Sequence, residues 1–230
     1  YSIIGVRPYL KLVKDDHGFF INGQKVSELS FEEYLKKYLS EHKDQNESGL
    51  PMLSGAVGYF SYEYGRKLME VPSHKENLVT IPDAVLVFYD MYIIEDCHEK
   101  KTYLVANGIT EDAEKLIESV EVRLTEVLIE KEQVADRPFD IEVTPNFKKE
   151  EYKQAVDDMI RYIIEGDIYI TNMTQQLEVK SNKKPLDVFY DLRENNPSPF
   201  GGYMDYGDFQ IVCASPERFL KMKKKHVNTR

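Results

Sequence analysis

The sequence predicts an α+β fold in which mostly antiparallel sheets pack with helices. Two features indicate hairpins: the Asn22-Gly23 dipeptide, and the Gly207-Asp208 turn between two apolar segments. Two long stretches, 110–132 and 147–165, carry apolar residues at helical spacing. Strands and helices do not alternate as they do in parallel sheets, which favours α+β over α/β.

The first quarter of the chain is predicted to form short strands followed by a helix. Residues 1–26 show strand patterns separated by turns. A capping box, Ser30 with Glu33, predicts a helix over 31–43. Residues 53–64 combine aromatic side chains with glycines, which is typical of a strand whose backbone is closely approached.

The next segments are predicted to be a long strand, its hairpin partner and a helix. Residues 83–95 show the longest strand pattern and are expected to pair with 102–106 across a turn. A helix should follow from 110 to about 132, with acidic residues in its first turn. The apolar residues on one side of this helix are Ala113, Leu116, Ile117, Val120, Leu124, Val127 and Leu128.

The stretch 133–146 is linker-like, with few apolar residues and with Pro138 and Pro145, and the domain boundary is expected within it. Proline and polar residues are typical of domain boundaries. We therefore predict a first domain over 1–132, a linker over 133–144 and a second domain over 145–230.

The second domain is predicted to open with a long helix over 147–165, ended by Gly166. The stripe of this helix that is expected to be buried consists of Val156, Met159, Ile160 and Ile163. Strands at 168–171 and 176–179, a helix opened by Pro185 and the final hairpin complete the prediction.

The composition disfavours several classes of partner. A net charge of −10 and a pI near 5.1 argue against nucleic acid or an anionic membrane, since both need a basic surface. No run approaches the roughly 18 apolar residues of a membrane span, and no basic and apolar leader opens the chain. We therefore expect a cytoplasmic protein, whose two cysteines, Cys97 and Cys213, are reduced and partly buried.

Motifs that would by themselves identify a reaction are missing from the sequence. The five histidines show no metal-ligand spacing, and no phosphate-binding or hydrolase motif is present. The carboxylates of Glu63, Asp167, Asp205 and Glu217 could form pairs, but their spacing selects none. Residue chemistry alone predicts no metal site and no catalytic group.

Several local patterns nevertheless resemble the large subunits of anthranilate synthase and aminodeoxychorismate synthase, which form one chorismate-using family. They are 1–5 (YSIIG), 55–66 (GAVGYFSYEYGR), 164–175 (IEGDIYITNMTQ), and the pair 196–200 (NPSPF) and 214–217 (ASPE). A helix cap or a turn explains any one of them. Only the family explains why all of them occur in the right order over nearly the whole chain.

Two positions favour the aminodeoxychorismate synthase branch of this family. Asn172 stands where that branch tends to have Asn and anthranilate synthases tend to have Val. Gly201 follows NPSPF where anthranilate synthases commonly have Met. Ile170 departs from the usual Gln of the family, so no role is carried over to it. Anthranilate synthase component I is the alternative.

The resemblance implies a substrate, a partner and a cofactor. Chorismate would react with ammonia from a glutamine amidotransferase (glutaminase) subunit to give 4-amino-4-deoxychorismate, with Mg²⁺ as cofactor. The family's catalytic groups and magnesium ligands are expected beyond residue 230. We therefore expect these 230 residues to be a piece of a longer protein, to contain no catalytic residue and to be inactive alone.

The resemblance also implies two groups of site residues. An effector pocket for tryptophan is expected at Ser2, Asn196, Pro199, Phe200 and Gly201. Residues expected near the active site are Asn172, Gln175 and Arg230. Two alternatives stay open: an effector-binding module without catalysis, and an interaction domain that docks a glutaminase.

Overall fold

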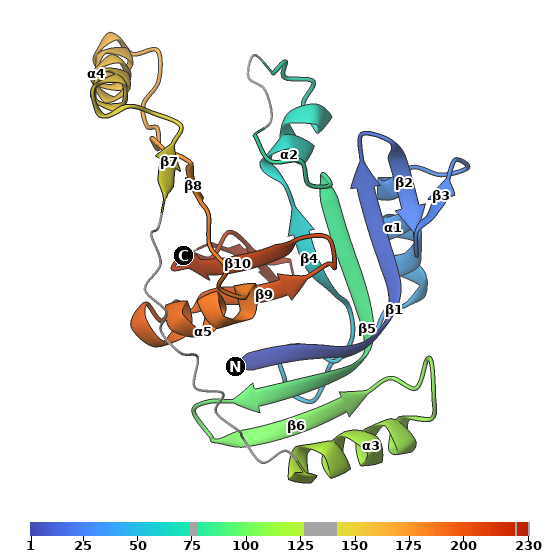
Figure 1. Ribbon diagram of the computed structural model, residues 1–230. Coiled ribbons are helices and arrows are strands. Elements are labelled where there is room, and N and C mark those ends of the chain that lie inside the picture. Colours follow the sequence, from blue (N-terminus) through green and yellow to red (C-terminus); the bar gives the residue numbers. More distant parts are fainter. Residues whose placement is uncertain (74–77, 127–141, 224, 230) are drawn as a thin grey trace. The chain divides into compact units, whose positions relative to one another are not determined.

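The computed structural model describes residues 1–73, 78–126, 142–223 and 225–229. The chain divides into two compact units, residues 1–130 and 131–230, and each is described by itself. Both contain helices and antiparallel strand pairs (Figure 1), so the predicted α+β class is confirmed.

A six-stranded antiparallel sheet forms the first unit. Its two long central strands, β1 (Ser2–Asp15) and β5 (Ala84–Asp96), pair along nearly their whole length, from Ser2 opposite Glu95 to Lys14 opposite Ala84. The register shifts between Pro8 and Leu10, which lets β1 continue past a residue that has no backbone N–H. The first strand is therefore longer than the short strands predicted for 1–26.

Two predicted hairpins are confirmed in this sheet. β2 (Gly18–Ile21) and β3 (Gln24–Val26) are joined through Asn22 and Gly23, both with positive φ, as a two-residue hairpin turn requires. On the other side of the sheet, β5 pairs with β6 (Lys101–Ala106), its predicted partner.

β4 (Ala56–Phe60) lies at the sheet edge and pairs with the first half of β5. The expected close approach of the backbone is found at Gly58, where a Cβ atom would lie 1.9 Å from the carbonyl oxygen of Val85. The strand predicted over 53–64 is right only for 56–60, since 53–55 and the residues after Phe60 are not in a strand. Ser61 accepts a hydrogen bond from Tyr64 N at 3.1 Å and so begins helix α2 (Tyr62–Leu68).

The other helices of this unit follow their local signals. α1 (Phe31–Glu41) begins with the predicted capping box, in which Glu33 N donates to Ser30 Oγ and Ser30 N donates to the Glu33 carboxylate. α3 spans Ala113–Glu126. The predicted continuation of this helix to 132, with Val127 and Leu128, lies outside the described residues.

Two hydrophobic clusters make up the core of the first unit. Leu86 and Phe88 of β5 pack with Phe31 of α1, whereas Met91 of β5 packs with Leu116 of α3. Since side chains alternate along a strand, the two clusters lie on opposite faces of β5. The sheet is therefore covered by helices on both sides, and most of the buried residues belong to β5.

Asp90 of β5 anchors the connection between β6 and α3. Its side chain is fully buried and accepts hydrogen bonds from Ile109 N at 2.9 Å and from Thr110 N at 2.6 Å. Burial alone would raise the pKa of Asp90, but these bonds and one from the Thr110 hydroxyl hold that pKa below its ordinary value.

The second unit consists of helices and three separate two-stranded sheets. Helix α4 (Lys149–Glu165) ends at Gly166, which has φ +85°, as predicted. β7 (Val143–Pro145) pairs with β8 (Leu177–Val179), so the last two residues of the predicted linker, Val143 and Thr144, belong to a strand. Residues 133–141 of that linker lie outside the described residues.

The remaining elements of the second unit are one helix and two strand pairs. Helix α5 (Pro185–Asn195) begins with Pro185, and the predicted hairpin is formed by β9 (Phe200–Asp205) and β10 (Gln210–Ser215). β11 (Lys221–Lys223) and β12 (His226–Asn228) form a last short pair. The strand predicted at 168–171 is wrong, because these residues have no regular structure and no strand partner.

The predicted burial of the α4 stripe is also wrong. Val156 and Met159 are half-buried, while Ile160 and Ile163 are 49% and 41% exposed. The helical period itself is right, but a period shows which face is apolar and not what covers it. No residue of 142–223 or 225–229 is buried.

Candidate functional site

The sequence-predicted effector residues of the second unit gather at the corner between α5 and β9. Asn196 ends α5, its N–H donating to the Leu192 carbonyl at 2.8 Å. Ser198 then ties the corner to the hairpin, because its hydroxyl donates to the Ala214 carbonyl at 3.1 Å. Gly201 N donates back to the Ser198 carbonyl at 3.2 Å. We call residues 196–201 the corner loop.

The ring of Phe200 is the largest apolar surface of the corner loop. It is half-buried, and the guanidinium carbon of Arg218 lies 5.0 Å from its centre. Such a contact is attractive because the ring face is electronegative. The neighbouring Gly201 has little room for a side chain, since a Cβ atom there would lie 3.2 Å from the Cys213 carbonyl oxygen. The corner loop thus presents an aromatic ring and a cation together.

Sequence reasoning missed Arg218 as a member of this site. The signal that could have found it is the hairpin register, which places Ser215 opposite Phe200. Arg218, three residues further on, can therefore reach the ring. No motif marked it, because the family pattern used for 214–217 stops one residue earlier.

The other sequence-predicted site residues belong to other parts of the sequence. Asn172 and Gln175 lie exposed in the segment between α4 and β8, and Arg230 lies outside the described residues. Ser2 belongs to β1 in the first unit, where its Oγ lies 3.4 Å from Cys97 Sγ. The structure therefore does not test the two predicted groups of site residues.

The far end of the β9–β10 hairpin holds a charged turn. Gly207 N donates to the Asp205 carboxylate at 2.8 Å, and Gln210 Nε2 donates to it at 3.0 Å. These two hydrogen bonds hold the pKa of Asp205 below its ordinary value. The carboxylate is engaged in closing the turn, so we assign it no chemical role.

Both cysteines are free thiols. Cys213 is half-buried on β10, with its Sγ 4.0 Å from the Phe200 carbonyl oxygen. Cys97 is exposed, so the expectation that it would be partly buried is wrong. It lies in the turn after β5, where its sequence neighbours Asp96 and His98 are polar and provide no apolar cover.

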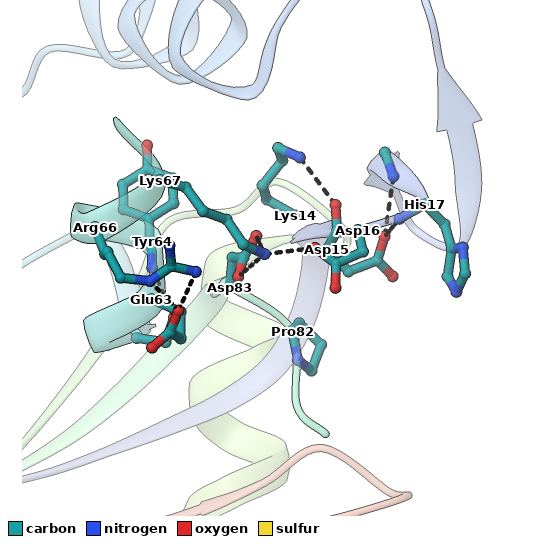
Figure 2. A network of polar contacts seen from close by, with 12 residues as sticks. Lys14, Asp15, Asp16, His17, Glu63, Tyr64, Arg66, Lys67, Pro82 and Asp83 are labelled. Atoms are coloured by element: carbon teal, nitrogen blue, oxygen red, sulfur yellow. Dashed lines mark hydrogen bonds and ion pairs between the residues drawn. The ribbon is translucent and has the colours of Figure 1, made fainter. Parts of the chain in front are cut away.

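A second polar cluster lies in the first unit, around the segment 55–66 that resembles the family. Figure 2 shows Lys67 reaching between two carboxylates, with its Nζ 2.8 Å from Asp83 Oδ1 and 2.5 Å from Asp16 Oδ1. Burial opposes the charge of Lys67, but hydrogen bonds from Nζ to both carboxylates raise its pKa above the ordinary value. The cluster fastens α2 to the turn that follows β1 and to the residue that precedes β5.

The neighbouring side chains of this segment are also structural. Glu63 pairs with Arg66 at 2.5 Å, and Tyr64 donates to the Glu32 carboxylate at 2.8 Å (Figure 2 shows the first pair). Every charged group here has a partner inside the fold. The segment therefore positions a helix, and its geometry suggests no catalysis.

Neither metal clusters nor membrane helices occur in the part of the chain that the structure describes. No three or more His, Cys, Asp or Glu side chains gather there in a group that could hold a metal ion. None of the helices described there is long and apolar enough to span a bilayer. The described donor sets do not fit Mg²⁺, so we assign no magnesium site to these residues.

Comparison with known proteins identifies the family. A family model described as chorismate binding enzyme matches residues 2–230. The chain belongs to the chorismate binding enzyme family. The match covers both structural units, so the family assignment does not depend on one motif.

Relatives of known name in the chorismate binding enzyme family include both branches. Anthranilate synthase component 1 of Acetivibrio thermocellus is 28% identical to this chain. The match covers all of this chain and 50% of that protein. Aminodeoxychorismate synthase component 1 of Bacillus subtilis is 29% identical. Its match covers 76% of this chain and 38% of that protein. The chain thus spans about half the length, or less, of the curated relatives it matches.

A solved structure shows the same fold. Anthranilate synthase component I from Streptococcus pneumoniae TIGR4 superposes with a TM-score of 0.83 at 24% sequence identity. The match covers 98% of this chain and 52% of that one. The predicted partial anthranilate synthase-like fold is therefore confirmed.

Proposed function

We propose that these 230 residues are part of the large subunit of a chorismate-using synthase. The observation that carries the proposal is the family match over residues 2–230. Such a subunit would replace a hydroxyl group of chorismate with ammonia supplied by a glutamine amidotransferase partner. Chorismate is a dicarboxylate whose hydroxyl leaves poorly, so the reaction calls for cationic groups and for a metal ion or acid at the leaving oxygen.

Within the family we propose aminodeoxychorismate synthase, with 4-amino-4-deoxychorismate as product. Asn172 and Gly201 support this branch, and the Bacillus subtilis relative belongs to it. Anthranilate synthase is the second candidate, because the Acetivibrio thermocellus relative, which matches the whole chain, carries that name. Both candidates share chorismate and the amidotransferase partner.

We propose that this chain provides structural support and an effector site for the enzyme. The catalytic groups would belong to other residues of the complete enzyme. The described residues include no group of three or more His, Cys, Asp or Glu side chains that could hold a metal ion. We propose that Asn172, Gln175 and Arg230 lie near the active site of the complete enzyme. The 230 residues alone should therefore turn over no chorismate, and product above the buffer background would contradict this.

A chimera tests the proposed function. This chain would replace the matched part of Bacillus subtilis aminodeoxychorismate synthase component 1, and a second chimera would use the Acetivibrio thermocellus anthranilate synthase component 1. We expect consumption of chorismate with ammonium and Mg²⁺, and higher activity relative to the parent in the Bacillus chimera. A folded pair of chimeras that consumes no chorismate would refute the function, and higher relative activity of the Acetivibrio chimera would refute the branch.

We also propose that the corner loop binds tryptophan as an effector. The ring of Phe200 offers a flat surface for an indole, and the Arg218 guanidinium beside it can attract a carboxylate. Asn196, Pro199 and Gly201 would form the backbone wall of the pocket. The N–H groups of Asn196 and Gly201 already donate within the fold, and Pro199 has none, so we assign recognition of the carboxylate to Arg218.

The Phe200→Ala variant of the active chimera should bind tryptophan more weakly by about 2- to 10-fold, from lost ring stacking. Titration calorimetry measures this. Phe209→Ala is the matched control, because Phe209 sits at the other end of the same hairpin, against Tyr206. Equal affinities of the two variants for tryptophan would mean that Phe200 does not contribute to the pocket.

A further inference from the structure

The chain contains two Asn-Gly dipeptides, Asn22-Gly23 and Asn107-Gly108. The side-chain amide of an asparagine can react with the backbone nitrogen of the next residue, and glycine, which has no Cβ, hinders this attack least. The first dipeptide forms the exposed two-residue turn between β2 and β3. Water therefore reaches it, and its reactivity depends on how the turn holds the Asn22 side chain.

Three hydrogen bonds fasten Asn22 to β1. Its backbone N–H donates to the Lys11 carbonyl at 2.9 Å, and Lys11 N donates to Asn22 Oδ1 at 2.7 Å. Its Nδ2 donates to the Tyr9 carbonyl at 3.1 Å. Tyr9 lies where the register between β1 and β5 shifts, so the amide supplies a donor at this irregularity. All three bonds join residues 9–22 of the first unit, so they do not involve the second unit.

These bonds oppose the reaction while the hairpin is intact. Attack requires Asn22 Cγ to turn toward the nitrogen of Gly23, and this rotation breaks both side-chain bonds to β1. The hairpin also fixes the φ angles of the two turn residues, at +48° and +82°. The reaction therefore requires local opening of the hairpin. Such opening is expected most readily at the end of the sheet, where β3 is the edge strand.

We infer that Asn22 is a site of spontaneous deamidation whose rate is set by opening of the β2–β3 hairpin. The Gly23 nitrogen forms a bond to Asn22 Cγ, the bond from Cγ to Nδ2 breaks, and ammonia leaves with the proton of the Gly23 N–H. Water then opens the five-membered imide at either carbonyl. The products are aspartate and isoaspartate, in which the main chain runs through the former side chain. Water is the only co-reactant, and the inference does not rest on the proposed function.

Either product weakens the attachment of the hairpin to β1. An aspartate in this position can still accept a hydrogen bond from Lys11 N, but it presents a carboxylate oxygen to the Tyr9 carbonyl in place of an N–H donor. A carbonyl that loses its donor and faces a second acceptor is destabilising. Isoaspartate adds a main-chain carbon to a turn whose geometry requires two residues of fixed φ. Deamidation should therefore loosen β2 and β3.

Deamidation rates of the folded and the unfolded chain test the inference. The 230-residue chain would be incubated in mildly alkaline buffer with and without urea. Mass spectrometry of its peptides then measures loss of the amide at each asparagine. We expect Asn22 to react at least about tenfold faster in urea. Asn107 is the internal standard, because the same dipeptide should react at a similar rate once the chain is unfolded. Equal rates at Asn22 with and without urea would refute the inference.

Two alanine variants of β3 test the dependence on hairpin opening. Val26 is half-buried, lies opposite Phe19 and packs on the hydrophobic cluster that contains it. Val26→Ala should therefore open the hairpin more often and speed deamidation of Asn22 in the folded chain by at least about threefold. Lys25→Ala, at an exposed position of the same strand, should change that rate by less than about twofold. Equal effects of the two variants would contradict control by the hairpin.

The Asn22→Asp variant tests the consequence of the reaction. Hydrogen exchange of amides 18–26 should be about fivefold faster than in the unchanged chain, because the bond to the Tyr9 carbonyl is lost. The amides of α3, which packs on a different hydrophobic cluster, serve as the control and should exchange at an unchanged rate. Unchanged exchange of amides 18–26 would show that the Asn22 amide does not fasten the hairpin, and this would overturn the inference.

Discussion

The Gly58→Ala substitution should lower the free energy of unfolding of the first unit by about 3 kcal/mol or more. The added Cβ would lie 1.9 Å from the carbonyl oxygen of Val85 and 2.9 Å from Leu86 Cα, and both are backbone atoms of β5. Backbone in the middle of a sheet cannot rotate away as a side chain can. β4 would have to separate from β5, with loss of hydrogen bonds and packing. Urea denaturation and hydrogen exchange of β5 amides measure the change.

Gly65→Ala provides the matched control seven residues away. Gly65 lies in α2, has no positive φ, and a Cβ there would meet no heavy atom within 4 Å. Alanine favours helix over glycine, so this variant should be neutral or more stable by up to about 1 kcal/mol. If both variants unfold at the same urea concentration as the unchanged chain, the close approach at Gly58 does not affect the free energy of unfolding.

Local chemistry allowed much of this fold to be predicted from the sequence. The Ser30–Glu33 capping box, the Asn22-Gly23 turn and the glycine at position 166 each specify a conformation within a few residues. The structure confirms all three. Each signal depends on side-chain hydrogen bonding or on positive φ, and neither needs information from elsewhere in the chain.

Long-range pairing could not be predicted in the same way. β1 lies beside β5, about eighty residues away in the sequence. The sequence pattern of neither strand indicates which strand it pairs with. The burial of the α4 stripe failed for a related reason, since Ile160 and Ile163 are apolar whether or not a covering layer is present. Periodicity shows which face of a helix is apolar, whereas the burial of that face depends on the rest of the fold.

The candidate site shows the same division. The corner loop was found through its proline-rich motif, which resembles the family pattern at 196–200. Arg218 and the bond from Ser198 to the Ala214 carbonyl were not found, because they depend on the register of the β9–β10 hairpin. Asp90 was missed as well, although an acidic residue within an apolar strand is itself a signal.

The Asp90→Asn substitution should destabilise the first unit by about 2–4 kcal/mol. The carboxylate is fully buried and accepts bonds from Ile109 N, Thr110 N and the Thr110 hydroxyl. An asparagine has one acceptor oxygen and an NH₂ group, which would face these donors. The connection from β6 into α3 would loosen, and hydrogen exchange of the α3 amides should increase.

The same carboxylate gives the unfolding free energy a defined pH dependence. Because hydrogen bonds lower the pKa of Asp90 in the folded state, its contribution is fully present above the ordinary carboxyl pKa of 3.8. The contribution falls as the pH drops below that value and is lost once the pH passes the lowered folded pKa. Other carboxylates titrate in this range, so the difference between the unchanged chain and Asp90→Asn isolates the effect. That difference should shrink with acidification.

Asp112→Asn is the control for this experiment. Asp112 is exposed in the same connection and accepts a hydrogen bond from Lys115 N at 3.2 Å. Asparagine caps a helix about as well as aspartate, so the change in unfolding free energy should stay within about 0.5 kcal/mol. Urea denaturation of the three proteins between pH 7 and pH 3 makes the comparison. A constant difference between the unchanged chain and Asp90→Asn over that range would mean that the Asp90 carboxylate is not held ionised by its hydrogen bonds.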